Sequence, residues 1–193
     1  MDTTCRILLI PGSLRRRSTT MAVLRTAQIV AHGCPSLLFE ATADLPHFNP
    51  DDDTDPLHPA VADLRGQIRA ADALLFSTPE YAGGLPGPFK NLLDWTVGDD
   101  QAGSMYEKPV AWINASPRGA SHAHESLRKV LGYVKADIVE SACVHFPVTE
   151  AMIGDDGLLA EPALRGQISD AITALADHVI RTGSGTEPGQ PLR

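Results

Sequence analysis

Residues 12–20, Gly-Ser-Leu-Arg-Arg-Arg-Ser-Thr-Thr, combine a glycine, hydroxyl groups and guanidinium groups just before a helix predicted over residues 21–31. The apolar run Ile7–Ile10 comes before them and predicts a buried strand that ends at Pro11. Loop N–H groups, serine and threonine hydroxyls and the positive end of the helix dipole would then meet at one point. Such a group of donors binds an anion, so the stretch predicts a phosphate-binding loop.

Several better-known anion-binding motifs are missing from this loop. It has no Gly-Lys-Ser/Thr of a Walker A motif, no Gly-x-Gly-x-x-Gly of a dinucleotide-binding turn and no cysteine nucleophile of a low-molecular-weight phosphatase. A structural role also stays open, because Ser18 or Thr19 can cap the helix. The two roles are compatible, since a helix cap and an anion site use the same donors.

A second stretch, residues 78–95, follows the buried strand predicted over Ala73–Ser77. Its loop contains several glycines and prolines, and a helical pattern opens near Pro86 and Pro88. Glycines allow the backbone to approach a flat ligand closely. Ligands of open α/β sheets bind at the carboxyl ends of strands, where this loop would lie, although an ordinary strand-to-helix turn has a similar composition.

The chain as a whole predicts that these two loops lie side by side. Five apolar runs alternate with helical patterns, which predicts an α/β fold: a flavodoxin-like three-layer sandwich around a five-stranded parallel sheet in the order 2-1-3-4-5. Strands one and three are neighbours in this order, so the loops that follow them meet at one edge. Strands are expected at residues 7–10, 36–40, 73–77, 108–115 and 137–144, and helices at 21–31, 60–71, from 86 onward, 127–134 and 162–181.

Both stretches resemble the signatures of one protein family. The pattern Gly-Ser-x-Arg-x-x-Ser that begins at Gly12 is similar to the first signature of the NADPH-dependent FMN reductase family, a flavodoxin-like group that includes chromate, quinone and azobenzene reductases. The Pro-Glu-Tyr at residues 79–81, the Pro-Gly at 86–87 and the Lys-Asn-x-x-Asp-Trp at 90–95 resemble its second signature. The resemblance covers most of the chain, and these two motifs are its specific parts.

The resemblance implies a redox enzyme whose chemistry belongs to a bound flavin. FMN would be the cofactor and NADPH or NADH the co-substrate. A small molecule such as a quinone, an azo compound, free flavin or a metal oxyanion would accept the electrons in a ping-pong mechanism. No side chain is expected to act as an acid or a base. A homodimer or homotetramer is also implied.

The same resemblance implies two groups of binding residues. The residues expected to bind the FMN phosphate are Ser13, Arg15, Ser18, Thr19 and Thr20, and those expected to border the isoalloxazine ring are Pro79, Glu80, Tyr81, Ala82, Gly83 and Ser116. Arg16 and Arg17 belong to neither group. Either one of them attracts the 2′-phosphate of NADPH, or the two form a solvated pair.

The third loop departs from the family pattern. Residues 116–121 follow the strand predicted over residues 108–115 and contain one glycine, whereas this place in the family is typically glycine-rich. Two alternatives to an enzyme therefore stay open. One is a flavodoxin-type electron carrier, and the other is a non-catalytic module in which the altered loop no longer holds FMN.

Other polar residues have simpler interpretations. The acidic run at residues 51–55 is interpreted as a solvated, flexible turn rather than a divalent-metal site, because no ordered ligand spacing is visible. His47 stands beside proline, so packing or solvation is favoured over proton transfer. His122 and His124 alternate without acidic or cysteine partners, so a metal site is not expected there.

Composition and charge limit the partners and the domain organisation. With 193 residues, a single FMN-binding domain over residues 1–181 and a disordered tail over residues 182–193 are expected. The formal charge of -8 argues against nucleic acid and anionic membranes as partners. Three scattered cysteines without a Cys-x-x-Cys pair, and the lack of a bilayer-length apolar run, predict a cytoplasmic protein.

Overall fold

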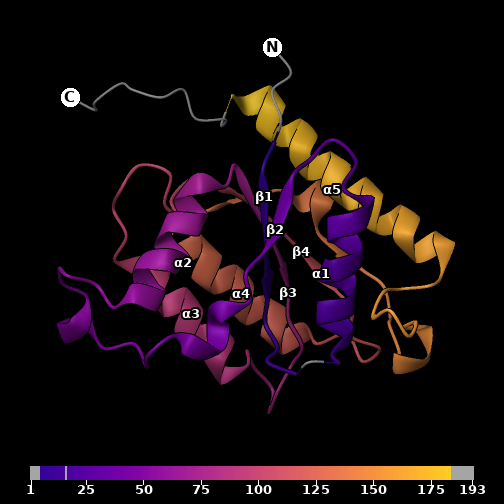
Figure 1. The fold of residues 1–193 in the computed structure, drawn as a ribbon, viewed down its shortest axis with the longest axis horizontal. Coiled ribbons are helices and arrows are strands. Elements are labelled where there is room, and N and C mark those ends of the chain that lie inside the picture. Colours follow the sequence, from indigo (N-terminus) through magenta and orange to yellow (C-terminus); the bar gives the residue numbers. More distant parts are fainter. Residues whose placement is uncertain (1–4, 16, 184–193) are drawn as a thin grey trace.

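A parallel β-sheet runs through the middle of the molecule, with helices on both of its faces (Figure 1). The structure, a computed structural model, describes residues 5–15 and 17–183. The strand order is β2-β1-β3-β4-β5, as predicted, and these strands pair in parallel. The strands are β1 (Ile7–Pro11), β2 (Ser36–Leu38), β3 (Ala73–Ser77), β4 (Pro109–Asn114), β5 (Asp137–Ile138) and β6 (Val144–His145), the last of which also pairs with β4.

Alternate side chains of β1 enter two separate cores. Ile7 and Leu9 pack with α1 and α5 on one face of the sheet, while Leu8 and Ile10 pack with α2, α3 and α4 on the other. Successive side chains of a strand point to opposite faces, so a strand that is apolar throughout needs a helical layer on each side. The three layers confirm the predicted sandwich. The helices are α1 (Thr19–Val30), α2 (Pro59–Ala70), α3 (Gly87–Val97), α4 (Ser121–Tyr133) and α5 (Pro162–Thr182).

The carboxyl ends of three strands meet at one edge of the sheet. Pro11 of β1 is paired with Ser77 of β3, and Phe76 of β3 is paired with Trp112 of β4. The loops that follow β1, β3 and β4 therefore begin side by side, as the predicted order requires.

The predicted fifth strand is present at its start as β5, but it does not run without a break over residues 137–144. A 3₁₀ turn, Glu140–Ala142, divides the run into β5 and β6, and each piece pairs separately with β4. Backbone N–H groups of this turn donate to carbonyl groups three residues earlier instead of to β4. The polar pair Glu140-Ser141 in the middle of the run was the sequence signal for the break.

The other boundaries lie close to those expected, with one exception. Helix α4 begins at Ser121 instead of residue 127, although the preceding residue has no side chain that can cap it. Thr182 is the last residue of α5, and residues 184–193 of the predicted tail lie outside the described residues. Within the part of the chain that the structure describes, no helix has the length and apolar character needed to cross a membrane.

Candidate functional site

The first loop (residues 12–18) begins against the second loop (residues 78–86). The N–H of Gly12 donates a hydrogen bond to the carbonyl of Ser77 over 2.8 Å. A Cβ placed on Gly12 would lie 2.2 Å from Oγ1 of Thr78 and 2.8 Å from its Cα, closer than Cβ atoms approach their neighbours. Glycine is therefore required here, and its bare backbone lets the two loops touch.

Three hydroxyl side chains at the start of α1 and in the first loop are buried. The exposed fraction is 3% for Ser13, 7% for Ser18 and 2% for Thr20. The Oγ of Ser18 accepts a hydrogen bond from the N–H of Met21 at 3.0 Å and lies 3.0 Å from Oγ1 of Thr20. The predicted helix cap is therefore present, and it stands at the helix end whose dipole attracts an anion.

The hydroxyl of Ser13 links the first loop to the second. Its Oγ accepts a hydrogen bond from the N–H of Arg15 at 3.2 Å and lies 3.3 Å from the phenol oxygen of Tyr81. Tyr81 is 45% exposed although Ser13 is buried. A ligand can therefore contact the ring of Tyr81 while the Tyr81 hydroxyl group keeps its contact with Ser13 of the first loop.

A two-residue turn gives the second loop its shape. The N–H of Tyr81 donates to the carbonyl of Gly84, and the N–H of Gly84 donates to that of Tyr81, each over 3.1 Å. Between them, Ala82 and Gly83 have φ angles of 49° and 74°, the left-handed values of a type I′ turn. Glycine adopts this conformation readily, and alanine does so at a cost. The predicted glycine-rich loop is thus a closed hairpin turn with Tyr81 at its base.

Glu80 connects the second loop to α4. Its Oε2 accepts a hydrogen bond from the N–H of Ala123 at 3.1 Å, and its Oε1 lies 3.8 Å from Nδ1 of His122. Ala120, just before the helix, provides no side-chain cap. Glu80 therefore caps α4 from another loop and places a negative charge at the positive end of its dipole. The sequence carried no signal for this contact, because Ala123 is 43 residues away.

Ser116 is held by contacts within and beside the third loop (residues 116–120). Its N–H donates to Oδ1 of Asn114 at 3.0 Å, and its Oγ accepts from the N–H of Arg118 at 3.2 Å. Its carbonyl oxygen lies 2.9 Å from Nε2 of His145. No described residue accepts a hydrogen bond from its hydroxyl, so a ligand contact of Ser116 would use this O–H group.

His124 is a buried side chain beside the third loop. It is 9% exposed, and its Nδ1 lies 2.9 Å from the carbonyl oxygen of Ala120. Burial lowers the pKa of His124 below its ordinary value, so the ring is neutral near pH 7. Its Nε2 has no hydrogen-bond partner among the described residues, and these contain no group of three His, Cys, Asp or Glu residues that could hold a metal ion.

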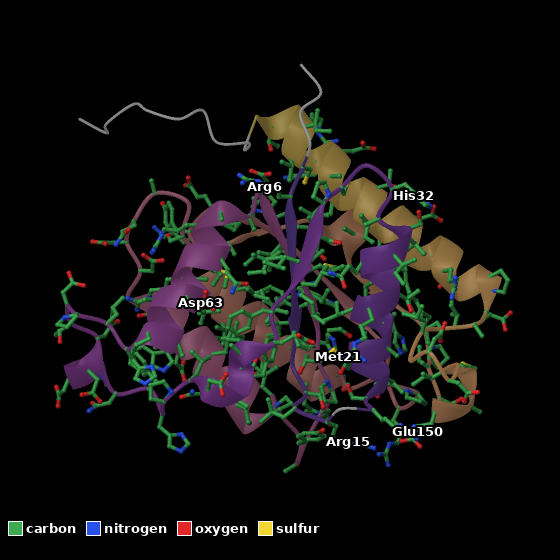
Figure 2. All side chains as sticks on the ribbon, viewed as in Figure 1. Arg6, Arg15, Met21, His32, Asp63 and Glu150 are labelled. Carbon is green, nitrogen blue, oxygen red and sulfur yellow. The ribbon has the colours of Figure 1, made fainter. Side chains whose placement is uncertain are left out.

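Arg15 and Arg17 are exposed at the mouth of the first loop. Nη2 of Arg15 lies 3.2 Å from Oε1 of Glu150, and Figure 2 shows both side chains beyond the carboxyl ends of the strands. These side chains are 63% and 74% exposed, and such exposed pairs contribute little stability, so another anion can replace Glu150. Arg16 lies outside the described residues.

The helix that follows the second loop anchors the segment after β2. Asn91 accepts a hydrogen bond from the N–H of Phe48 at 2.7 Å and donates one to the carbonyl of Pro46 at 2.8 Å. Nε1 of Trp95 donates to the same carbonyl at 2.8 Å. His47, between these anchored residues, is exposed. This role of the Lys-Asn-x-x-Asp-Trp motif was not predicted from the sequence, although the spacing of Asn91 and Trp95 places them on one helix face.

The acidic run at residues 51–55 is not a solvated turn throughout. Oδ1 of Asp53 lies 2.8 Å from Nη1 of Arg65, and Oδ2 accepts a hydrogen bond from Nη2 at 2.9 Å. Arg65 is 5% exposed and also donates from Nε to the carbonyl of Trp95. The flexible-turn prediction is therefore wrong for Asp53, because this buried guanidinium group holds its carboxylate.

The cysteines are unpaired and two of them are strongly shielded. Burial raises the pKa of the Cys5 thiol to about 12 and that of the Cys143 thiol to about 11. Both residues therefore carry neutral thiols near pH 7, which are poor nucleophiles.

Known proteins are similar to this chain over most of its length. The family model described as NADPH-dependent FMN reductase matches residues 5–150. A probable NADPH:quinone oxidoreductase of Oryza sativa subsp. japonica is 30% identical over 183 residues, which cover 91% of this chain and 89% of the relative. An NAD(P)H-dependent FMN reductase of Pseudomonas aeruginosa is 31% identical over 183 residues, with 94% and 98% covered. The solved structure of FerB, a flavoenzyme NAD(P)H:(acceptor) oxidoreductase from Paracoccus denitrificans, matches with a TM-score of 0.72 at 26% identity and covers 91% of this chain and 99% of its own.

Proposed function

The chain belongs to the NADPH-dependent FMN reductase family, and we propose that it is an oxidoreductase that reduces a small acceptor by a ping-pong mechanism. FMN as cofactor and NADPH or NADH as co-substrate follow from the family. The proposed acceptor is a quinone, an azo compound, free flavin or a metal oxyanion, and the relative named as a quinone oxidoreductase supports the first of these. The contact between Ser13 and Tyr81 carries the proposal, because it joins a loop suited to phosphate with a loop suited to a flat ring.

The chemistry of the available donors fits FMN at both ends. At the first loop, buried hydroxyl groups surround the amino end of α1, and Arg15 adds a positive charge. This is the donor set that a phosphate monoester requires. At the second loop, the hairpin turn presents backbone and an exposed tyrosine ring, which suits a planar heterocycle. The residues proposed to hold the phosphate are Ser13, Arg15, Ser18, Thr19 and Thr20, and those proposed to border the ring are Pro79, Glu80, Tyr81, Ala82, Gly83 and Ser116.

Bound FMN would supply the redox chemistry, taking a hydride from NAD(P)H and passing electrons to the acceptor. The role of the chain is then to bind and orient. The carboxylate of Glu80 is already occupied by the N–H of Ala123, so Glu80 would meet the ring through its backbone. Fixed backbone N–H groups of the second loop would stabilise negative charge that develops on the ring. This role requires no acid or base side chain.

A visible absorption spectrum of the purified protein, before and after FMN is added and the excess removed, tests the proposal first. We expect the flavin bands to be retained, bleached by NADPH or NADH without oxygen, and restored by a quinone. Retained bands that neither nicotinamide bleaches would indicate a flavodoxin-type electron carrier. A colourless protein that retains no FMN would indicate a non-catalytic module.

We propose in addition that residues 1–181 form a single FMN-binding domain that assembles as a homodimer or homotetramer in the cytoplasm. The unpaired cysteines of the structure support a reducing compartment. The net charge of -8 argues against nucleic acid as a partner. Light scattering after size exclusion measures the assembly, and a mass of one chain would contradict this part of the proposal.

A further inference from the structure

The side chain of Asn114, the last residue of β4, bonds both ends of the third loop. Asn114 is 7% exposed. Its Oδ1 accepts a hydrogen bond from the N–H of Ser116 at 3.0 Å, and its Nδ2 donates one to the carbonyl of Gly119. Asparagine commonly bonds the backbone two residues further on, but the second bond spans the whole loop. We call these two hydrogen bonds the Asn114 clamp.

The Asn114 clamp holds a backbone conformation that one of the loop residues adopts only at a cost. Gly119 and Ala120 have φ angles of 86° and 45°, so two successive residues lie in the left-handed region. Glycine adopts this conformation readily, and alanine does not. The Gly119 carbonyl belongs to the peptide group that joins the two residues, so its bond from Asn114 fixes that peptide group. The clamp therefore supports an alanine at a place where the family pattern is typically glycine-rich.

Contacts from β6 hold Ser116 on its other side. His145 lies beside Asn114 in the register of β6 and β4, and its Nε2 lies 2.9 Å from the carbonyl oxygen of Ser116. A carbonyl oxygen only accepts, so this nitrogen carries the proton. The same oxygen accepts from the N–H of Gly119 at 3.2 Å. Both backbone polar groups of Ser116 are thus occupied, and its hydroxyl is the group that can donate to a ligand.

The segments before and after the third loop are attached to β3 and the second loop. Ser77, at the end of β3, donates from Oγ to the carbonyl of Ile113 at 2.8 Å. Glu80 of the second loop accepts from the N–H of Ala123 in α4. The Asn114 clamp closes the chain between these two attachments. It therefore determines where Ser116 lies relative to the hairpin turn of the second loop.

We propose that Asn114 is a positioning residue that holds the hydroxyl of Ser116 where it donates a hydrogen bond to the flavin ring. This inference rests on the proposed function, which supplies the FMN. Asn114 touches no ligand and acts through Ser116. A donor whose position is fixed in advance stabilises negative charge on the ring without reorganising. The clamp thus does here what additional glycines would otherwise do, which is to give the loop a shape that suits the ring.

The first test measures the loop without ligand and then its affinity for FMN. In the FMN-free protein, Asn114→Ala should raise the rate of amide hydrogen exchange at Ser116, measured by NMR, by about tenfold. In fluorescence titrations it should weaken FMN binding by about twofold to tenfold. Asn49→Ala is the matched control. Its Oδ1 accepts from the N–H of Asp51 at 3.2 Å with the same two-residue spacing, but in an exposed turn, so both values should stay within about twofold.

Two further measurements separate positioning from a general loss of stability. The reduction potential of bound FMN should become more negative in Asn114→Ala, because the reduced ring loses a fixed donor. In an Ala120→Gly background, Asn114→Ala should cost less FMN affinity, because glycine keeps the left-handed conformation without the clamp. Asn114→Asp keeps the acceptor for Ser116 and loses the donor to Gly119, so its FMN affinity should lie between those of Asn114 and Asn114→Ala.

The outcomes distinguish this inference from the proposed function. If FMN is retained and Asn114→Ala changes neither its affinity nor its potential, the inference is overturned and the function stands. An equal loss of affinity with and without Ala120→Gly would also overturn it. If the unsubstituted protein retains no FMN, the proposed function falls, and exchange at Ser116 decides the clamp alone. Faster exchange in Asn114→Ala then supports the clamp as the group that orders the loop, and unchanged exchange overturns it.

Discussion

The phenol oxygen of Tyr81 lies 3.3 Å from Oγ of Ser13, and this contact joins the loops that follow β1 and β3. Ser13 is buried in a loop that backbone hydrogen bonds hold in place, and Tyr81 is half exposed. The contact therefore fixes to this loop an aromatic ring that a ligand can reach. The two ends of the proposed FMN site are therefore held at a set separation by side chains and not by the chain path alone.

Tyr81→Phe should weaken FMN binding by about twofold to tenfold, since one neutral hydrogen bond contributes about 0.5–1.5 kcal/mol. Ser13→Ala should weaken it further, because the N–H of Arg15 also loses its acceptor. Quenching of flavin fluorescence measures both dissociation constants. The effects should be less than additive in the double variant, because both single changes remove the same contact. Fully additive effects would show that the contact does not support the site.

Glu80→Ala should lower the free energy of unfolding by about 1–2 kcal/mol, because α4 loses its only N-terminal side-chain cap among the described residues. Glu80→Gln keeps an acceptor oxygen and should lose less. Urea unfolding followed by circular dichroism measures these values. Glu125→Gln is the matched control, an exposed glutamate early in the same helix, and should change stability by no more than about 0.5 kcal/mol. Equal losses for Glu80→Ala and Glu125→Gln would contradict the capping role.

The sheet order and the place of the two loops were predictable because they depend on apolar runs and on local turn chemistry. β1 and β3 are buried along their whole length, so their composition alone indicates central strands. The helix cap at Ser18 follows from a residue and its immediate neighbours. Such features need no knowledge of distant contacts.

Contacts between distant segments were not predictable in this way. The start of α4 depends on Glu80, and the fixed position of Asp53 in the acidic run at residues 51–55 depends on Arg65. Neither partner lies in the segment that it stabilises. In each case a tertiary contact, and not the local sequence pattern, determines the local structure.

Asp53→Asn should lower the free energy of unfolding by about 3–5 kcal/mol, because it leaves the guanidinium group of Arg65 buried without its counter-charge. Chemical unfolding at neutral pH measures this loss. Asp51→Asn changes an exposed carboxylate of the same run and should cost no more than about 0.5 kcal/mol. If the two variants lose the same stability, the run is a solvated turn after all.

Lys108 should make the protein more stable as the solution becomes alkaline. Its side chain is 7% exposed, and its Nζ donates a hydrogen bond to the carbonyl of Ala71. Burial lowers the pKa of Lys108 to about 8 from an ordinary value of 10.5. Between these two pH values the unfolded chain holds a proton that the folded chain has released. The free energy of unfolding therefore rises with pH across this window.

Lys108→Met isolates this contribution, because the variant has no proton to release. We expect the stability of the original protein minus that of the variant to increase by a few kcal/mol at most between pH 8 and pH 10.5. Below pH 8 the difference should be constant, since Lys108 is charged in both folded and unfolded chains. Lys129→Met, on the exposed side of α4, is the control and should give a difference that does not change over the same range. A flat difference for Lys108→Met would show that water reaches its ammonium group in the folded protein.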